Sequence, residues 1–403
     1  MKAGWEAKSL EEIAAFSNGL WTGKKGPFIT AKVIRNTNIR PHGVLSLDDV
    51  AEIEVEARHL AKRELRFGDI IIEKSGGGPK QPVGRVVKFE LDEKGYSFSN
   101  FTSAIRVNDP LVIDYSYLHH VLNWWYASGV TERIQSNSTG IRNLDFDAYK
   151  KLNVPLPPLA EQKQIVAVLD EAFEGLSRAR ANAEANLIDA KELFNTTLGS
   201  VFSSSHSGWA TSTIGSLCTL RSGTTVPKEL ERSDKGIPYV KVGDMNLQSN
   251  IGGVVTSSRF LRRSDVSARQ IFPPGTTIFP KRGGAILTNK KRLVLKEICA
   301  DLNVMGVIPG TKIDPEFVYF YFLSVDMRKI GSGASIPQIN NYDVEPLPIC
   351  YPEDLGKQQD IVAKLKEALT NSGVLSATYS AKVESLEVLR QSLLQKAFSG
   401  ELT

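Results

Sequence analysis

Two glycine-containing segments carry the residue types that bind phosphate groups and base edges. The first segment has Lys74, Ser75, Gly76–Gly78, Lys80, Gln81 and Arg85. The second has Lys281, Arg282, Gly283, Gly284, Thr288, Asn289, Lys290, Lys291 and Arg292. Lysine and arginine neutralise phosphates, glycine permits close backbone approach, and Asn, Gln and Arg can hydrogen-bond to base edges in the major groove of DNA. Both segments are therefore candidate DNA-contact loops.

Further cations extend this candidate surface. They are Lys24, Lys25, Arg262 and Arg263. The alternative interpretation is that both loops are ordinary solvated hairpins, as most runs of charge are. The occurrence of the same kind of loop twice, at equivalent places, favours nucleic acid.

Signatures of catalysis and of metal binding are absent from the sequence. Neither G-x-x-x-x-G-K-S/T nor a strand-linked G-x-G-x-x-G occurs, so no nucleotide loop is expected. The run Phe272–Gly275 (FPPG) lacks the leading Asn or Asp and the trailing aromatic residue of an amino-methyltransferase motif. None of the five histidines has metal-ligand spacing. We predict no catalytic residues, no metal site and no cofactor in this chain.

The elements that carry these loops are predicted to form α/β (α+β) domains. Residues 68–89 and 275–295 each have the pattern of a buried strand, a glycine-containing loop and a second strand. Residues 114–129 and 314–333 each have the pattern of a helix that an aspartate caps at its start and a glycine ends.

The chain also repeats itself. LAEQKQIVAVLDEAF (159–173) aligns with LGKQQDIVAKLKEAL (355–369) at an offset of 196 residues, and the alignment continues without a gap to the carboxyl end. Internal repeats of this kind indicate a duplicated structural unit. The sequence is thus organised as two copies of a long variable module, each followed by a short regular one.

The two short modules have the apolar period of helices that pack lengthwise in a coiled-coil pair. The predicted packing positions are Ile165, Leu169, Leu176, Leu187 and Phe194 in the first copy, and Ile361, Leu365, Leu375, Val383, Leu386 and Leu393 in the second. Prolines precede each helix and end the extended segment before it. We predict two long antiparallel helices that act as spacers between two similar globular domains, related by a pseudo-two-fold repeat.

Length, charge and composition agree with this organisation. The predicted boundaries are 1–155 and 206–350 for the globular domains, and 156–205 and 351–403 for the helices. The globular segments carry net charges of +2 and +6, and the helical ones −3 and −1, within a total of +4. Three widely spaced cysteines and the lack of a long apolar run predict a soluble, cytoplasmic protein of a reducing compartment, with no membrane contact.

The sequence resembles the DNA-specificity (S) subunits of type I restriction–modification systems. The resemblance covers the whole chain and is strongest in PLPPLAEQKQIVAVLD (155–170), LGKQQDIVAKL (355–365) and LEVLRQSLLQKAFSGEL (386–402). A proline-rich segment before an E/K-Q-x-x-I-V helix and a terminal L-x-x-x-F-S-G-E-L are characteristic of that family. Gly356-Lys357 departs from the Ala160-Glu161 of the first copy.

The resemblance implies a non-enzymatic subunit with two target-recognition domains that each read half of an asymmetric bipartite site in double-stranded DNA. It implies two methyltransferase (M) subunits that bring S-adenosylmethionine, and restriction/translocase (R) subunits that use ATP and Mg. The main alternative is a self-contained type IIG-like methyltransferase or nuclease with its own specificity domain. A coiled-coil adaptor without a DNA role would leave the two cationic loops unexplained.

Overall fold

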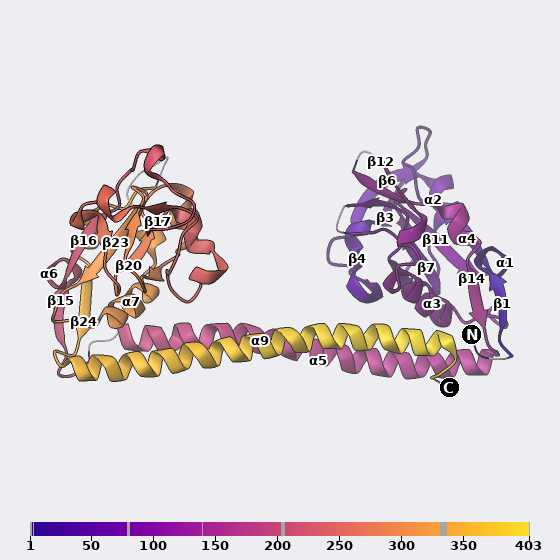
Figure 1. Ribbon diagram of the computed structural model, residues 1–403. Helices are drawn as coiled ribbons and strands as arrows, with labels where there is room; N and C mark the ends of the chain where they lie inside the picture. The colour runs from indigo at the N-terminus through magenta and orange to yellow at the C-terminus, as the bar shows by residue number, and fades with distance from the viewer. Residues whose placement is uncertain are drawn as a thin grey trace. The chain divides into compact units, whose positions relative to one another are not determined.

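The computed structural model describes residues 2, 4–78, 81–138, 140–202, 206–330 and 337–402. The chain forms two compact units, one made of Met1–Ala183 with Ala381–Thr403 and the other of Glu184–Ser380. Each unit contains a globular domain and parts of two long helices (Figure 1). The division between the units falls within the long helices.

The globular domain of the first unit is built on two neighbouring sheets. A four-stranded antiparallel sheet has the order β2 (Ala14–Asn18), β11 (Thr102–Val107), β7 (Asp69–Glu73), β9 (Val86–Phe89). A three-stranded sheet has the order β10 (Tyr96–Phe98), β3 (Phe28–Ile34), β6 (Ala51–Glu56), and β10 runs parallel to β3. The other pairs and strands are β1 (Glu6–Ser9) with β14 (Asn153–Leu156), β4 (Ile39–Arg40) with β5 (Val44–Leu45), and β12 (Gln135–Ser138), β13 (Ile141–Leu144) and β8 (Ser75–Gly77).

Helices cover and close this domain. Helix α3 (Tyr115–Ala127) buries most of its residues in the main core, where Tyr117 and Leu118 have no exposed surface. The shorter helices are α1 (Leu10–Ile13), α2 (Ala57–Arg63) and α4 (Phe146–Lys150). Full burial of large aromatic and aliphatic side chains supplies the main favourable free energy of folding.

The second unit repeats this plan with different side chains. Its antiparallel sheet has the order β16 (Cys218–Ser222), β23 (Val304–Pro309), β20 (Thr277–Pro280), β21 (Arg292–Leu293). The neighbouring sheet has the order β18 (Phe260–Leu261), β17 (Ile237–Val240), β22 (Ile298–Ala300), β19 (Ile271–Phe272), and β22 runs parallel to β17. The remaining strands and α-helices of this domain are β15 (Ala210–Thr213) with β24 (Pro348–Tyr351), α6 (Ile214–Leu217), α7 (Pro315–Ser324) and α8 (Asn341–Val344).

The predicted duplication is confirmed at the level of strand order. The sheet β2-β11-β7-β9 corresponds to β16-β23-β20-β21, and the parallel pair β3/β10 corresponds to β17/β22. Both predicted strand–loop–strand segments form antiparallel pairs, β7 with β9 and β20 with β21. The fold class is thus mixed α and β, with the same domain built twice.

The long helices are α5 (Leu159–Phe202) and α9 (Leu355–Ser399). In the first unit, the start of α5 shares a core with the end of α9, and in the second unit the end of α5 shares a core with the start of α9. The two helices therefore run antiparallel within each unit. Of the predicted packing positions, four are buried: Ile165, Leu169, Phe194 and Leu365. Six are partly exposed: Leu176, Leu187, Ile361, Val383, Leu386 and Leu393.

One predicted packing position differs in the structure. Leu375 is 37% exposed, whereas Ser372, one turn earlier, is buried. The Ser372 hydroxyl donates a 2.6 Å hydrogen bond to the carbonyl of Ala190 on α5. Ala190 is buried as well, so small side chains bring the two helices close together here and the apolar period is interrupted.

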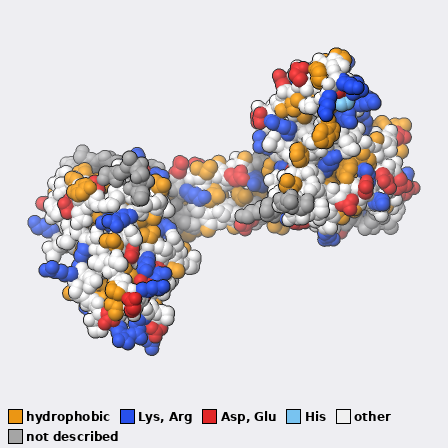
Figure 2. Space-filling model, turned by 90° about the horizontal axis from the view of Figure 1, so that it is seen from above, with side chains coloured by type: hydrophobic (Ala, Val, Ile, Leu, Met, Phe, Trp, Pro, Cys, Tyr) orange, Lys and Arg blue, Asp and Glu red, His pale blue; other side chains and the backbone are white. Residues whose placement is uncertain are grey.

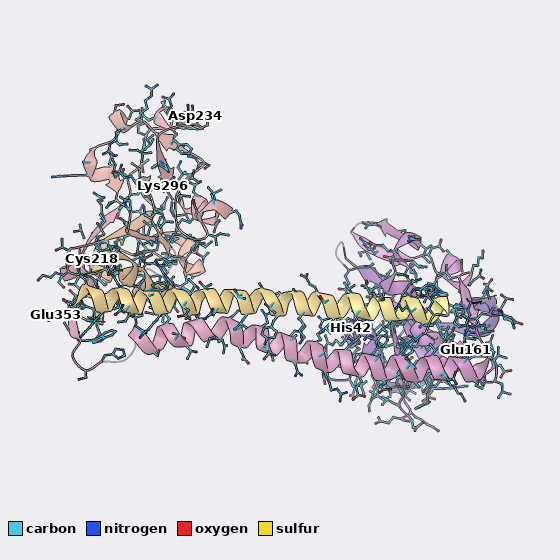
Figure 3. All side chains as sticks on the ribbon, turned by 60° about the horizontal axis from the view of Figure 1, so that its bottom comes forward. His42, Glu161, Cys218, Asp234, Lys296 and Glu353 are labelled. Atoms are coloured by element: carbon cyan, nitrogen blue, oxygen red, sulfur yellow. The ribbon has the colours of Figure 1, made fainter. Side chains whose placement is uncertain are left out.

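Further contacts within the first unit join the two long helices to each other and to the first domain. The Arg390 guanidinium on α9 lies 3.8 Å from the ring centre of Phe173 on α5 and donates a hydrogen bond to the carbonyl of His42. Glu161 on α5 accepts hydrogen bonds from Lys2 Nζ at 2.8 Å and from Trp5 Nε1 at 3.2 Å. Figure 3 labels His42 and Glu161 beside the helices. Among the described residues, no helix is both long and apolar enough to cross a membrane.

Candidate nucleic-acid interface

A buried glutamine fixes the start of α5 to the first globular domain. Gln162 has no exposed surface, and its Oε1 accepts a 2.9 Å hydrogen bond from the backbone N–H of Asp114. Its Nε2 donates to the carbonyls of Val112 and Pro157, at 3.0 and 2.8 Å. The Asp114 carboxylate in turn caps α3 by accepting from the N–H groups of Ser116 and Tyr117.

The second domain has the same arrangement. Gln358 is also fully buried, and its Oε1 accepts a 2.7 Å hydrogen bond from the backbone N–H of Asp314, which caps α7. Its Nε2 donates to the carbonyls of Lys312 and Pro352, at 3.3 and 2.7 Å. The glutamine of the repeated sequence motif thus has a structural role that periodicity alone did not reveal: it fastens each globular domain to the long helix that follows.

The first cationic loop connects β7 to β9 and is largely engaged within the fold. The Arg85 guanidinium binds both carboxylate oxygens of buried Glu73, at 2.8 and 3.0 Å, and the carbonyl of Ile39. Lys74 Nζ donates to Asn18 Oδ1 at 2.7 Å, and burial together with the charge of Lys150 lowers its pKa. The DNA contact of Arg85 stays a prediction, and this ion pair disfavours it, because an ion pair with a buried carboxylate is costly to break.

The other predicted contacts in this loop are Ser75, Lys80 and Gln81. The Ser75 hydroxyl donates to Asn143 Oδ1, and the side chain of Gln81 is exposed. Lys80 lies outside the described residues. Among the described members of this loop, Gln81 is thus the predicted contact whose side chain is exposed.

The second cationic loop contains a 3-10 helix, Gly283–Thr288, between β20 and β21. Lys281 and Lys291 are 7% and 2% exposed. Lys281 Nζ donates to Ser222 Oγ at 2.7 Å, and Lys291 Nζ donates to Asn289 Oδ1 and to the Val325 carbonyl, at 2.7 and 2.6 Å.

Burial disfavours the charged form of these lysines. It lowers the pKa of Lys281, with a further contribution from the charge of Arg282, and it lowers the pKa of Lys291 to about 8. The DNA contacts of Lys281, Asn289 and Lys291 therefore stay predictions that these hydrogen bonds and the burial of both lysines disfavour. These three residues hold the loop to the rest of the domain, and Asn289 Oδ1 also accepts from the backbone of Met327.

The exposed cations form a smaller set than the sequence suggested. Arg262 and Arg282 are exposed and have no ion pair among the residues that the structure describes, whereas Arg263 pairs with Glu297 at 3.0 Å. Lys290 contacts Asn246 Oδ1, and the partly exposed Arg292 donates to the carbonyl of Lys291. The space-filling view shows blue lysine and arginine side chains among apolar ones on both globular domains (Figure 2).

In the first domain, Lys24 and Lys25 are exposed at the tip of the loop before β3. Their backbone N–H groups each donate a 2.6 Å hydrogen bond to Glu56 Oε1. The hydrogen bond from Lys25 and the neighbouring Arg58 lower the pKa of Glu56 to about 2. The backbone is thus anchored while both lysines stay exposed, as a phosphate contact requires.

In the described part of the chain, no cluster of three or more His, Cys, Asp or Glu side chains could hold a metal ion. The three cysteines are free thiols. What the surface offers is exposed arginine, lysine and amide groups on two similar domains.

The sequence profile of the type I restriction modification DNA specificity domain matches residues 2–186 and again residues 206–384. The chain belongs to this family. Its two matches coincide with the two copies of the globular domain and much of the helix that follows each. A member of this family is a DNA-recognition subunit rather than an enzyme, and the alternative of a self-contained type IIG-like protein is not favoured.

Curated relatives and solved structures agree with this assignment. The chain is 23% identical to the EcoKI specificity subunit of Escherichia coli K12 and 23% identical to the StySPI specificity subunit of Salmonella potsdam. Each alignment covers 99% of this chain and 89% of the relative.

The fold matches a chain in a structure that describes complex assembly and conformational transition of the type I R-M system. That chain is 20% identical, with a TM-score of 0.79 over 100% of this chain and 99% of the other. The HsdS subunit from Thermoanaerobacter tengcongensis is 19% identical, with a TM-score of 0.65 over 100% and 98%. At these identities the likeness shows the fold.

Proposed function

We propose that each globular domain reads one half of an asymmetric, split site in double-stranded DNA. The observation that carries this proposal is the duplicated scaffold with unlike surfaces: the same strand order occurs twice, while the exposed loop residues differ between the copies. Two identical domains in a symmetric dimer would read a palindrome. Two different domains in one chain read two different half-sites.

We further propose that the long helices are the docking surface for two methyltransferase subunits. These helices carry several apolar side chains that remain exposed: Val168, Ile188, Leu193, Leu355, Leu369, Val374, Leu375, Val388 and Leu389. Exposed apolar side chains along a helix favour a protein partner, and the net negative charge of the helical segments disfavours DNA. The similarity to a chain solved in a study of type I R-M complex assembly supports a multisubunit role. Restriction/translocase subunits would bind outside this methyltransferase core.

The cofactors of the reaction are proposed to belong to the partners. S-adenosylmethionine would bind the methyltransferase subunits, and ATP with Mg the restriction subunits, all in the prokaryotic cytoplasm. The purified chain alone should therefore bind no S-adenosylmethionine in isothermal titration calorimetry and transfer no methyl group to DNA. The reconstituted complex with its methyltransferase should do both. Saturable binding or turnover by the isolated chain would contradict this division of roles.

DNA binding by the assembled complex provides the direct test of the interface. Replacing Arg262 and Arg282 by Ala should weaken binding and flatten the dependence of log Kd on log salt concentration by about two units, because each lost phosphate contact contributes about 0.9. Fluorescence anisotropy over a salt series measures that slope. The expectation follows from the exposure of both guanidinium groups.

Two control variants distinguish the loss of charge at the interface from a loss of charge elsewhere on the protein and from a loss of stability. Lys191→Ala removes an exposed cation from α5 and should leave the slope unchanged. Lys291→Met should lower the melting temperature, because it removes the lysine donor to the Val325 carbonyl and leaves Asn289 Oδ1 with the N–H of Met327 alone, but it should also leave the slope unchanged. Equal slopes for all four proteins, wild type included, would show that the two arginines belong to a solvated surface.

A further inference from the structure

A cavity in the first domain combines exposed aromatic side chains with an apolar lining. Its volume is about 500 Å³, which lies within the range of roughly 300–1,000 Å³ common for small-ligand sites. Trp21 and Phe101 line it and are 65% and 47% exposed. The apolar part of the lining is formed by Leu20, Val33, Ile53 and Val55. Leaving two large aromatic side chains in water at one cavity is unfavourable unless a ligand or partner covers them.

Polar groups without partners accompany this apolar surface. Asn36 Oδ1 and Ser99 Oγ are buried and have no hydrogen-bond partner among the described residues, and both residues line the cavity. Asn100 and Thr37 also line it. Most buried polar atoms in folded proteins are hydrogen-bonded. Apolar faces with a few polar groups at the edge suit a flat heterocyclic ring better than an aliphatic chain.

The cavity adjoins the first cationic loop. Gly76 of that loop lines it, and Asn36 Nδ2 donates a 2.6 Å hydrogen bond to the carbonyl of Ser75. Gly76 has a φ of +98°, and a Cβ there would lie 2.9 Å from Asn36 Nδ2. The one cation among the lining residues is Arg35, whose guanidinium pairs with Asp49 at 3.2 Å. The backbone of the first cationic loop thus forms one edge of the cavity.

The second domain provides an internal comparison, because hydrogen bonds align the two copies residue by residue. The N–H of Thr102 donates to the carbonyl of Ser99 at 3.0 Å, as the N–H of Val304 does to that of Asp301 at 2.9 Å. Two residues after Ser99 comes Phe101, and two after Asp301 comes Asn303.

The other aromatic position is aligned in the same way. The N–H of Leu20 donates to the Phe98 carbonyl at 2.8 Å, and the N–H of Thr224 donates to the Ala300 carbonyl at 2.9 Å. Trp21 therefore corresponds to Thr225. The scaffold is shared, but the pair of aromatic side chains occurs in the first domain only.

We propose that this cavity binds the planar ring of a nucleobase that leaves the DNA stack within the half-site read by the first domain. The proposal rests on the proposed DNA-reading function. Bases stack on exposed aromatic side chains in proteins that bind unpaired nucleic acid, and a pocket that takes an extruded base needs an apolar slot with polar groups at its edge. Trp21 and Phe101 would stack with the ring, and Asn100 would hydrogen-bond to its edge.

The test uses the reconstituted complex with its methyltransferase and the site found by methylome sequencing. Each base of the first half-site is removed in turn, which leaves an abasic position, or is replaced by a mismatched base. The Kd for each DNA is measured with the wild type and with the double variant Trp21→Thr, Phe101→Asn, which carries the residues found at the equivalent positions of the second domain. At one position, the wild type should lose about tenfold in affinity when the base is removed. It should bind the mismatch several-fold more tightly, because unpairing is already complete. The double variant should show neither effect at that position.

Phe67→Asn is the matched control, since Phe67 is 53% exposed in the same unit but does not line the cavity. It should behave as wild type. Equal base and mismatch effects in wild type and double variant at every position would overturn the proposal, as would a double variant that binds DNA normally but no longer binds the methyltransferase subunit. If the wild-type complex shows no sequence-specific binding at all, the proposed function itself fails, which is a different result.

Discussion

Replacing Gln162 by Leu is expected to lower the free energy of unfolding of the first unit by about 3–5 kcal/mol. Leucine has a similar size but no hydrogen-bonding groups, so the N–H of Asp114 and the carbonyls of Val112 and Pro157 lose their partner. A buried polar group left unpaired costs about 1–3 kcal/mol. Urea denaturation measures the change, and hydrogen exchange followed by mass spectrometry should show faster exchange at the start of α3.

Gln358→Leu should act on the second unit in the same way, with faster exchange at the start of α7, because its three partners are equivalent. Gln164→Leu is the control, since Gln164 lies two residues away on the same helix and is exposed. It should change the free energy of unfolding by less than about 0.5 kcal/mol. If Gln162→Leu and Gln164→Leu were equally stable, the buried hydrogen bonds would not be what joins domain and helix.

The sequence correctly predicts the features that depend on local patterns of residues. The long helices were predicted from apolar spacing, and the duplication from a gap-free alignment of 159–173 with 355–369. Asp114 and Asp314 were predicted as helix caps, and both carboxylates accept from the first N–H groups of their helices. Such signals need no knowledge of distant partners.

Contacts between residues that lie far apart in the sequence determine which of the candidate side chains are buried or paired. Lys291 was predicted as a phosphate contact from its neighbours in sequence, but it is buried because the Val325 carbonyl, 34 residues away, accepts its hydrogen bond. Arg85 is held by Glu73 across the β7–β9 pair. Trp21 and Phe101 meet at one cavity because Leu20 and Ser99, far apart in the sequence, form a parallel bridge. Composition of a loop therefore indicated which chemistry was present but not which side chains face the solvent.

Exchange of the first globular domain should change one half of the recognised sequence and leave the other half and the gap between them unchanged. The structure gives the exchange points, because β1 and β14 pair antiparallel with Glu6 opposite Leu156. The chain thus enters the first globular domain at Glu6 and leaves it at Leu156, and these two points lie side by side. The corresponding domain of a relative can replace residues 6–156 while Gln162 and the long helices are unchanged. Methylome sequencing of cells that carry the hybrid complex reads both half-sites at once.

Lengthening both helices should change the gap between the half-sites and leave the bases of both half-sites unchanged. Seven residues inserted after Ala183 in α5 and seven after Ser380 in α9, where the two units meet in sequence, add about 10 Å to each helix. Seven is the repeat that keeps a coiled-coil seam facing its partner. With base pairs about 3.4 Å apart, the unspecified gap should grow by about three base pairs while both half-sites stay the same.

An insertion in α5 alone is the control for this experiment, because it shifts one side of the seam against the other. It should reduce stability and methylation without defining a new gap. If the double insertion changed the bases that are read, or the domain exchange changed both half-sites, recognition and spacing would not be separate properties of the domains and the helices. A hybrid with one new half-site and an unchanged gap, together with a double insertion that shows the opposite, would assign base reading to the globular domains and distance to α5 and α9.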